Sequence, residues 1–222
     1  MARAQGARAR MALAFETTYG TPPASGYTRM PFASTSLGAE QPLLNSELLG
    51  YGRDPLAPVK DAVTADGDVV VPIDAEAFGF WLKAAFGAPT TTGAEAPYSH
   101  EFQSGSWTLP SMSIETGMPE VPRYAMYSGC VLDQITWQMQ RSGLLTATAR
   151  LVAQGETVGT TTSAGTAEPA GAASAAGRMT IGEIIGAFAT GEPPLRIGNA
   201  HYSIAPFDTF ACADRPIIIC AA

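Results

Sequence analysis

The sequence predicts a mainly β protein: an antiparallel β-sandwich or barrel with one flanking α-helix. Only 15% of the 222 residues are charged, while 23 are Gly and 17 are Pro. Gly and Pro mark turns and weaken helix interiors, so this composition favours a loop-rich β fold over a helical bundle. Two consecutive segments within residues 130–153 also alternate between apolar and polar side chains, which is typical of strands with one buried face.

The N-terminus predicts an arm rather than a core element. Residues 1–14 carry Arg3, Arg8 and Arg10 among small side chains. Chain termini are often disordered, so we expect a solvated arm. The alternative is contact with another subunit or with an acidic neighbour.

Residues 15–65 predict short strands and loops. Pro biases the residue before it toward an extended conformation, and this segment contains prolines at six positions: Pro22, Pro23, Pro31, Pro42, Pro55 and Pro58. Asp66-Gly67-Asp68 is typical of a turn, and Val69-Val70-Val71 of the strand that follows it.

Residues 75–86 predict the one clear helix. Asp74 can cap its N-terminus by accepting hydrogen bonds from free backbone amides, and Gly87 followed by Pro89 ends it. Apolar side chains recur at helical spacing and form a stripe that should pack against a sheet rather than bind a ligand: Phe78, Trp81, Leu82, Ala85 and Phe86.

After a Thr- and Gly-rich loop at 90–96, three strand-like segments follow. Residues 107–116 alternate, with Pro110 marking an edge or a bend. Residues 130–140 alternate more regularly: Val131, Ile135, Trp137 and Met139 on one face, and Leu132, Gln134, Thr136, Gln138 and Gln140 on the other. Arg141-Ser142-Gly143 predicts a hairpin connection. The return strand places an apolar set on one face: Leu145, Ala147, Ala149, Leu151 and Ala153.

The chain changes character after residue 157. Residues 158–177 consist mainly of Thr, Ser, Ala and Gly, and we expect a low-complexity linker. Residues 178–222 predict a small irregular C-terminal segment with a short helix near 181–188 and a buried strand at 217–219. The expected organisation is therefore four parts: 1–14, 15–157, 158–177 and 178–222.

Charge and composition exclude several classes of function. The net charge is −7 and the only lysines are Lys60 and Lys83, so no basic face for gripping nucleic acid is visible. The three cysteines, Cys130, Cys212 and Cys220, are odd in number and lack metal-type spacing, which favours synthesis in a reducing cytoplasm. We expect neither a signal peptide nor a membrane span, because no apolar stretch is long enough.

No catalytic, cofactor-binding or metal-ligating residue is predicted, and we expect no enzyme and no cofactor. The two histidines, His100 and His201, lie in different regions and accompany no nucleophile motif. His100 is interpreted as a strand residue. Glu115 and Glu120 are interpreted as a chance pair of acids, because surface carboxylates are mostly solvated.

A series of short motifs runs through residues 11–157. It consists of Phe15 to Pro23, Met30-Pro31-Phe32, Val71 to Asp74, Phe78 to Lys83, Phe86 to Thr91, Tyr98 to Phe102, Leu109-Pro110-Ser111, Ile114-Glu115 and Gly129-Cys130-Val131. The order of these motifs resembles that of siphophage-type phage tail tube proteins.

This resemblance implies a structural virion protein of the viral tail. Such subunits self-assemble as homohexameric rings, and the rings stack into a tube through which DNA leaves the particle. The expected partners are other copies of the chain, other tail proteins and DNA that passes without specific binding; no membrane is expected. Expected locations are the virion tail and, during assembly, the host cytoplasm. Residues 1–157 contain 15 acidic and 10 basic residues, and this net negative charge suits a lumen that repels phosphates. The polar strand faces are candidate lumen or inter-subunit surfaces.

Residues 190–220 resemble a different family. The sequences Gly191 to Pro194, Arg196 to His201, Ile204 to Phe207, Ala213-Asp214 and Ile217 to Ile219 resemble an internal piece of family III CoA-transferases. The catalytic aspartate of that family belongs upstream, where residues 172–189 contain no aspartate. Some thirty residues of a large enzyme are not expected to catalyse a reaction.

We hypothesise that the chain is a fusion of a truncated tube domain, a linker and an enzyme fragment. The alternative functions are a CoA-transferase-derived fragment or another virion structural protein, such as a head–tail connector. Sequencing the source DNA across the codons for residues 155–195 tests the hypothesis. One uninterrupted frame within a phage tail operon, with a matching purified product, would indicate a natural chain.

Overall fold

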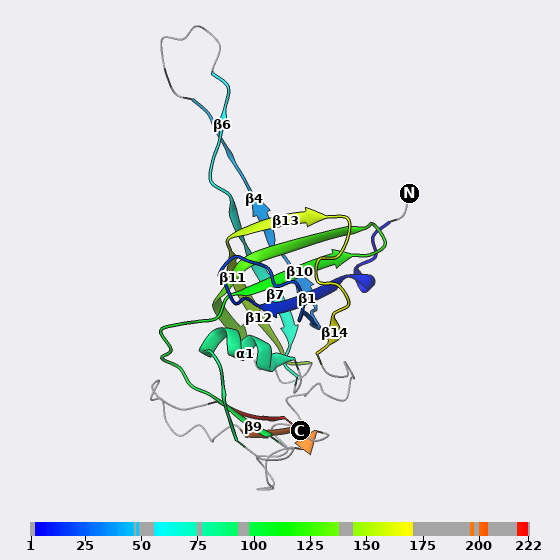
Figure 1. The fold of residues 1–222 in the computed structure, drawn as a ribbon, viewed down its shortest axis with the longest axis vertical. Coiled ribbons are helices and arrows are strands. Elements are labelled where there is room, and N and C mark those ends of the chain that lie inside the picture. Colours follow the sequence, from blue (N-terminus) through cyan, green and yellow to red (C-terminus); the bar gives the residue numbers. More distant parts are fainter. Residues whose placement is uncertain are drawn as a thin grey trace.

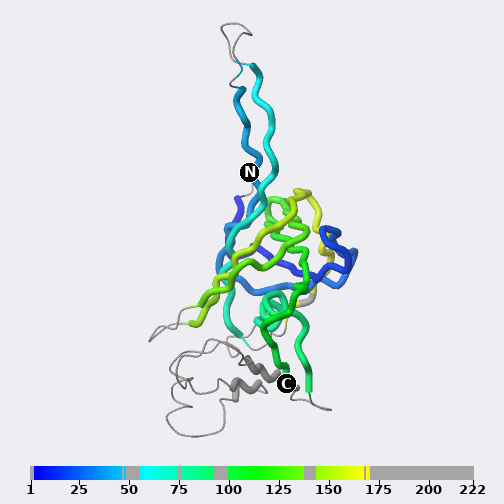
Figure 2. Tube along the Cα trace, turned by 90° about the vertical axis from the view of Figure 1, so that its left-hand side faces the viewer, coloured from blue at the N-terminus to red at the C-terminus, as the bar shows by residue number. Residues whose placement is uncertain are grey.

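The computed structural model describes residues 3–46, 48, 56–74, 77–92, 98–137, 144–170, 196–197, 200–203 and 217–221. A β-rich body carries a long, thin hairpin that projects from one end, while helix α1 and a second, smaller sheet lie at the other end (Figures 1 and 2). The predicted class, mainly β with antiparallel sheets and one α-helix, is confirmed for the described part of the chain.

Ten strands form the main sheet, and all but one of their pairings are antiparallel. The strand order is β14-β2-β1-β10-β11-β12-β7-β3, with β13 paired to β11 and β4 paired to β7. The parallel exception is β14 beside β2. The strands are β1 (Arg10–Phe15), β2 (Thr28–Arg29), β3 (Ser34–Thr35), β4 (Gly38–Glu40), β7 (Thr64–Pro72), β10 (Met112–Met118), β11 (Arg123–Trp137), β12 (Thr146–Ala153), β13 (Gly155–Gly159) and β14 (Glu168–Pro169).

Two smaller sheets complete the fold. Strands β5 (Leu43–Leu44) and β6 (Val59–Lys60) pair in the projecting hairpin. Five strands form the second sheet in the order β15-β16-β17-β9-β8. These are β8 (Thr90–Thr92), β9 (Tyr98–Phe102), β15 (Arg196–Ile197), β16 (Ala200–Ser203) and β17 (Ile217–Ala221).

Strand β11 connects the two halves of the main sheet. Its first half pairs with β10 and β13, and its second half pairs with β12. The change occurs at Gly129, which has φ of +63°, a left-handed conformation that glycine adopts without steric cost. A Cβ atom at this position would lie 2.9 Å from Cβ of Gln154 and 3.2 Å from Cζ of Tyr19. Glycine is therefore required at this corner by both its conformation and its surroundings.

The carboxylate of Glu16 holds the same corner in place. One oxygen accepts hydrogen bonds from the Gly129 amide at 2.8 Å and the Ser113 hydroxyl at 2.6 Å. The other accepts from the Ser111 hydroxyl and the Gly20 amide, both at 2.8 Å. Burial raises the pKa of Glu16, but these four hydrogen bonds outweigh burial, so the pKa lies below its ordinary value of 4.5. Glu16 thus joins the end of β1 to β10 and β11 as an ionised group.

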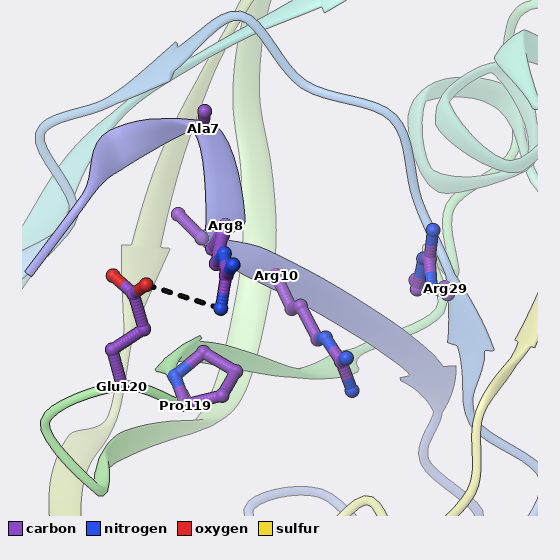
Figure 3. A pocket seen from close by; sticks show the side chains of 7 residues that line it. Ala7, Arg8, Arg10, Arg29, Pro119 and Glu120 are labelled. Carbon is purple, nitrogen blue, oxygen red and sulfur yellow. Dashed lines mark ion pairs between the residues drawn. The ribbon is translucent and has the colours of Figure 1, made fainter.

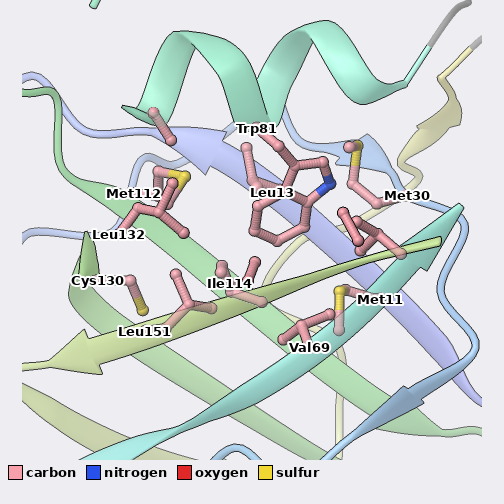
Figure 4. Packing of buried hydrophobic residues seen from close by; sticks show 14 of the residues in the cluster. Met11, Leu13, Met30, Val69, Trp81, Met112, Ile114, Cys130, Leu132 and Leu151 are labelled. Carbon is pink, nitrogen blue, oxygen red and sulfur yellow. The ribbon is translucent and has the colours of Figure 1, made fainter. Parts of the chain in front are cut away.

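The main core lies between the sheet and helix α1 (Phe78–Phe86). Figure 4 shows Trp81 of the helix pointing among Leu13, Ile114 and Leu132, which come from three different strands. Trp81 is 1% exposed, and full burial of a large apolar side chain contributes about 1.5–3 kcal/mol. At the rim of the core, Phe15 stacks on Phe80 with ring centroids 6.3 Å apart. Side-chain burial therefore fixes the helix against the sheet.

The predicted helix begins later than expected, but its other features are confirmed. It starts at Phe78 instead of residue 75, and residues 75–76 lie outside the described residues. Asp74 accepts hydrogen bonds from the amides of Ala77 and Phe78, which is the capping role predicted for it. The amide of Gly87 donates to the carbonyl of Lys83 and closes the last turn. The whole predicted apolar stripe packs into the core.

The prediction of a solvated arm was wrong for residues 10–14. They belong to β1, which lies between β2 and β10 in the main sheet. Met11 and Leu13 are fully buried in the core. The intervening Ala12 and Ala14 are also buried, against a second cluster on the other face, so the usual alternation of apolar and polar side chains is absent.

The predicted turn at Asp66-Gly67-Asp68 was also wrong, because these residues lie inside β7. A Cβ atom on Gly67 would be only 2.6 Å from Cα of Leu37. The glycine therefore permits close approach of the segment that joins β3 to β4, rather than a turn. Ser36 in that segment exchanges hydrogen bonds with the backbone of Asp68. For residues 15–46, 48 and 56–65, which the structure describes, the predicted short strands and loops are confirmed.

Two further strand boundaries differ from the prediction. Residues 107–111 precede β10 rather than belonging to it, and Trp107 is fully exposed. Pro110 lies in this non-strand part and supplies no amide hydrogen for a sheet. Residues 90–92, expected in a loop, form β8 and pair with β9.

The predicted faces are right for β12 and wrong for part of β11. All five residues of the predicted apolar face of the return strand are buried. In β11, however, Leu132 is buried and Val131 is only half-buried. The pairing with β12 shifts between Leu132 and Gln134, so Asp133 forms a bulge that reverses the alternation. The predicted connection at 141–143 lies outside the described residues.

The segment after β12 is not an unburied linker. Residues 155–159 form β13, residues 168–169 form β14, and Ala164 and Ala170 are buried. The linker prediction was therefore wrong for 158–170, because parts of this segment pair as strands and two of its alanines are buried. Residues 171–177 and the helix predicted near 181–188 lie outside the described residues.

The described residues of the C-terminal segment form three strands where an irregular structure was predicted. Residues 217–219 do form a strand, within β17, as the sequence indicates. Strand β17 pairs with β9 over five residue pairs, from Ile217 opposite Phe102 to Ala221 opposite Tyr98. Backbone pairing therefore joins this segment to β9, the second strand after helix α1.

Replacing Gly129 with alanine should destabilise the fold. Because a left-handed non-glycine residue is strained and the added Cβ meets Gln154, we expect Gly129→Ala to lower the free energy of unfolding by about 1–3 kcal/mol. Gly155→Ala is the matched control, since its Cβ would meet nothing within 4 Å. Urea denaturation measures both. Equal stability of the two variants would contradict the role given to the corner.

Replacing Glu16 with glutamine should remove a pH-dependent part of the stability. A carboxyl whose pKa is lowered on folding stabilises the fold above its unfolded pKa, and this contribution disappears as the pH falls below 4.5. We expect Glu16→Gln to cost about 1–2 kcal/mol at pH 7 and progressively less below pH 4.5.

Thermal melts of both proteins between pH 3 and 7 measure this difference. Glu40→Gln, at an exposed site, is the control. A gap between wild type and Glu16→Gln that does not change with pH would show that the charge of Glu16 is unimportant.

Candidate assembly surfaces

The projecting hairpin is the most prominent feature outside the core. It is defined here as residues 38–66, of which 38–46, 48 and 56–66 are described. Its base is the β4–β7 pairing and its outer part the β5–β6 pairing. Between them, the Asp61 amide donates to the Pro42 carbonyl at 2.9 Å and the Gln41 side chain donates to the Asp61 carbonyl at 2.9 Å. Figures 1 and 2 show that the hairpin extends well clear of the body.

The hairpin carries exposed apolar side chains. Each is between 39% and 66% exposed: Leu43, Leu44, Leu48, Leu56, Val59 and Val63. An isolated two-stranded hairpin is only marginally stable in water, and clustered exposed apolar residues mark sites of protein contact. The hairpin is therefore a candidate surface for another protein chain.

The outward face of β11 and β12 has a different, polar character. Exposed or half-exposed residues on it include Gln134, Thr136 and Thr148. The guanidinium of Arg150 lies 3.7 Å from the carboxylate of Asp133, and both side chains are more than half exposed. Such an exposed ion pair adds little stability. This face can contact water or a polar solute.

An acidic strip continues this face toward the hairpin. It consists of Glu40 on β4 and of Asp66 and Asp68 on β7, all exposed. Ala65 and Val69, which flank these aspartates along β7, are buried, so the carboxylates lie on the outer face of the sheet. Within the described residues none of the three takes part in an ion pair.

A basic hollow lies at β1 and β2, toward the other end of the strand order. It has a volume of about 500 Å³ and is lined by Arg8, Arg10 and Arg29, with Pro119 and Glu120 at its rim (Figure 3). Arg8 forms an ion pair of 3.2 Å with Glu120. The described residues provide no acidic partner for the other two arginines.

The two acids singled out from the sequence have separate structural roles. Glu115 is 5% exposed and accepts hydrogen bonds from the Thr162 hydroxyl and the amides of Ser163 and Ala164. It thereby fixes the segment between β13 and β14 to the sheet. Glu120 pairs with Arg8 at the rim of the basic hollow. The partners of Glu115 and those of Glu120 are therefore different.

The other chemically notable groups also serve the fold. His100 lies in β9 and its Nδ1 is 2.8 Å from the Thr91 hydroxyl on the paired strand β8. Burial raises the pKa of the Cys130 thiol to about 12, so the thiol stays protonated at neutral pH. Burial likewise raises the pKa of Tyr127 to about 12, and its hydroxyl donates to the carbonyl of Leu37 at 2.9 Å.

Within the described residues, no three His, Cys, Asp or Glu side chains cluster as metal ligands would. Among the same residues, no helix is long and apolar enough to cross a membrane.

The assembly surfaces were only partly visible in the sequence. Arg8 and Arg10 were noted as a basic run, but their grouping with Arg29 depends on β1–β2 pairing, in which Ala12 lies opposite Arg29. The hairpin was predicted only as short strands and loops. The sequence feature that indicates the hairpin is a set of leucines, Leu43, Leu44 and Leu48. They lie between prolines in a segment too polar to form a core.

Two solved structures are partly similar to this chain. The first is a chain of the anti-feeding prophage baseplate, determined by cryo-electron microscopy with 6-fold symmetry applied. It is 11% identical, with a TM-score of 0.45, and the match covers 71% of this chain and 96% of that chain. The second is a chain of an extracellular contractile injection system, a sheath–tube complex in the extended state. It is 8% identical, with a TM-score of 0.45, and the match covers 68% and 88% of the two chains.

A short stretch is similar to an enzyme. Over 32 residues the chain is 56% identical to an acetyl-CoA:oxalate CoA-transferase of Acetobacter aceti. The match covers 14% of this chain and only 8% of the length of the enzyme. The resemblance to a CoA-transferase is thus confirmed as that of a short fragment.

A far larger part of the chain matches a family of structural proteins. Residues 6–191 match the family model described as phage tail tube protein. The match is longer at both ends than the motif series at 11–157, and it includes β1, the projecting hairpin and the segment fixed by Glu115. The chain therefore belongs to the phage tail tube protein family.

Proposed function

We propose that this chain is a subunit of a phage tail tube, in which six copies form a ring and the rings stack around a channel for DNA. Family membership over residues 6–191 carries the proposal. The protein acts by assembly in the virion tail, where its partners are other copies of itself and other tail proteins. It is made in the host cytoplasm and needs no cofactor.

The projecting hairpin supports assembly through direct protein contact. Its exposed leucines and valines lose water-accessible area only if another chain covers them, and burial contributes about 25 cal/mol per Å² of apolar surface. A hairpin that fits a different surface on the next copy makes a head-to-tail contact. Contacts of this kind generate rings when the rotation between copies closes.

The polar face of β11 and β12 is the surface best suited to line the channel. It offers hydroxyl and amide groups from Thr136, Thr148 and Gln134, together with the Asp133–Arg150 pair. A wall of this composition does not grip a polyanion, because it has no excess of guanidinium or ammonium groups. DNA would pass along such a wall without specific binding.

Replacing two hairpin leucines should weaken assembly without affecting the fold. We expect the double variant L43S/L44S to sediment as monomer at concentrations where the unaltered protein forms rings, because it removes the apolar contact. The melting temperature should stay within a few degrees, since both side chains are more than half exposed.

Sedimentation velocity over a concentration series and thermal melts provide the two readouts. Val158→Ser is the matched control, because Val158 is also 50% exposed but lies on β13. Unchanged assembly of L43S/L44S would contradict the role of the hairpin.

A further inference from the structure

The basic hollow has a charge that its own chain does not balance. Arg8, Arg10 and Arg29 line it and come from η1 (Gly6–Arg8), β1 and β2 (Figure 3). Glu120 neutralises Arg8, whereas Arg10 and Arg29 have no ion pair within the described residues. Arg10 and Arg29 also line two adjoining hollows along the β1–β2 edge, one of which Glu115 lines as well. In a chain of net charge −7, such a local excess of positive charge indicates a site for carboxylates or other anions.

The same chain carries the complementary surface. The acidic strip, made of Glu40, Asp66 and Asp68, holds three exposed carboxylates without an ion-pairing base in the described residues. It lies at the base of the projecting hairpin, where β4 pairs with β7. When the hairpin of one copy extends over its neighbour, the strip is the next part of the surface to reach that neighbour.

The geometry points to a second copy of this chain as the occupant of the basic hollow, with the acidic strip of one subunit paired to the arginines of the next. This inference rests on the proposed function and adds the residues that select and orient the neighbour. Because the two patches differ, the contact is head-to-tail, as a closed ring requires.

Charge complementarity favours a second copy over DNA as the partner. Arginines facing a DNA channel would hold the phosphates and slow passage, whereas arginines covered by carboxylates would not. Pairing also relieves repulsion within a ring of acidic subunits. The hollow therefore serves assembly rather than nucleic-acid binding.

Two charge-reversed variants test the pairing. R10E/R29E makes the hollow acidic, and E40R/D66R makes the strip basic. Each variant alone then carries two patches of like charge, so each should require at least about tenfold more protein than wild type to assemble. Mixed in equal amounts, the two variants should co-assemble, because every contact between unlike copies again joins opposite charges.

Sedimentation velocity at 50 and 300 mM NaCl measures assembly, and the mixed complex should weaken at the higher salt concentration. The charge-preserving variants R10K/R29K and E40D/D66E are the controls and should assemble within about threefold of wild type. Melting temperatures of the single proteins verify folding.

The outcomes separate this inference from the proposed function. If wild type forms rings and R10E/R29E does so equally well, the tube function stands and the pairing is wrong. If wild type forms no rings but the mixed variants pair at low salt, the contact stands and ring assembly fails. A third result would also overturn the inference: binding of short duplex DNA that depends on Arg10 and Arg29, with assembly unchanged.

Discussion

The fold depends on one corner in strand β11, where a single strand serves both halves of the main sheet. At Gly129 the strand exchanges its partners β10 and β13 for β12, and the Glu16 carboxylate accepts hydrogen bonds from both β10 and β11 at that point. A side chain at Gly129 would meet Gln154, which lies between β12 and β13. The sheet can therefore enclose its core only if this residue has no side chain and the buried amide has a partner.

Once the corner is formed, inner and outer surfaces acquire different chemistry. The inner surface holds Trp81, Leu13 and their apolar neighbours, with helix α1 covering them. The outer surfaces remain free for contact: an apolar hairpin, a polar strand face, an acidic strip and a basic hollow. A monomer gains nothing from the exposed leucines of the hairpin or from the unpaired charges of Arg10 and Arg29. The proposed assembly with further copies would cover the leucines and pair these charges.

The sequence predicts those elements whose side chains follow one simple period. Helix α1 and strand β12 were identified with their buried faces, because the spacing of Trp81 and Leu82 and the alternation from Leu145 to Ala153 are regular. Strand β1 was missed because Ala12 and Ala14 are buried on the second face. The predicted faces of β11 were partly wrong because the bulge at Asp133 reverses the alternation. Gly67 resembles a turn residue in the sequence, but in the structure it permits close approach of the backbone. The basic hollow could not be found, because only the pairing of β1 with β2 brings Arg29 to Arg10.

Negative-stain electron microscopy of the purified, concentrated protein in moderate salt tests the central claim most directly. Rings, or hollow tubes with sixfold end views, are the predicted result and would show that this chain assembles without other tail proteins. Only small particles or amorphous aggregate, at every concentration and salt, would contradict the claim that this chain builds a tube, although its membership of the family would stand.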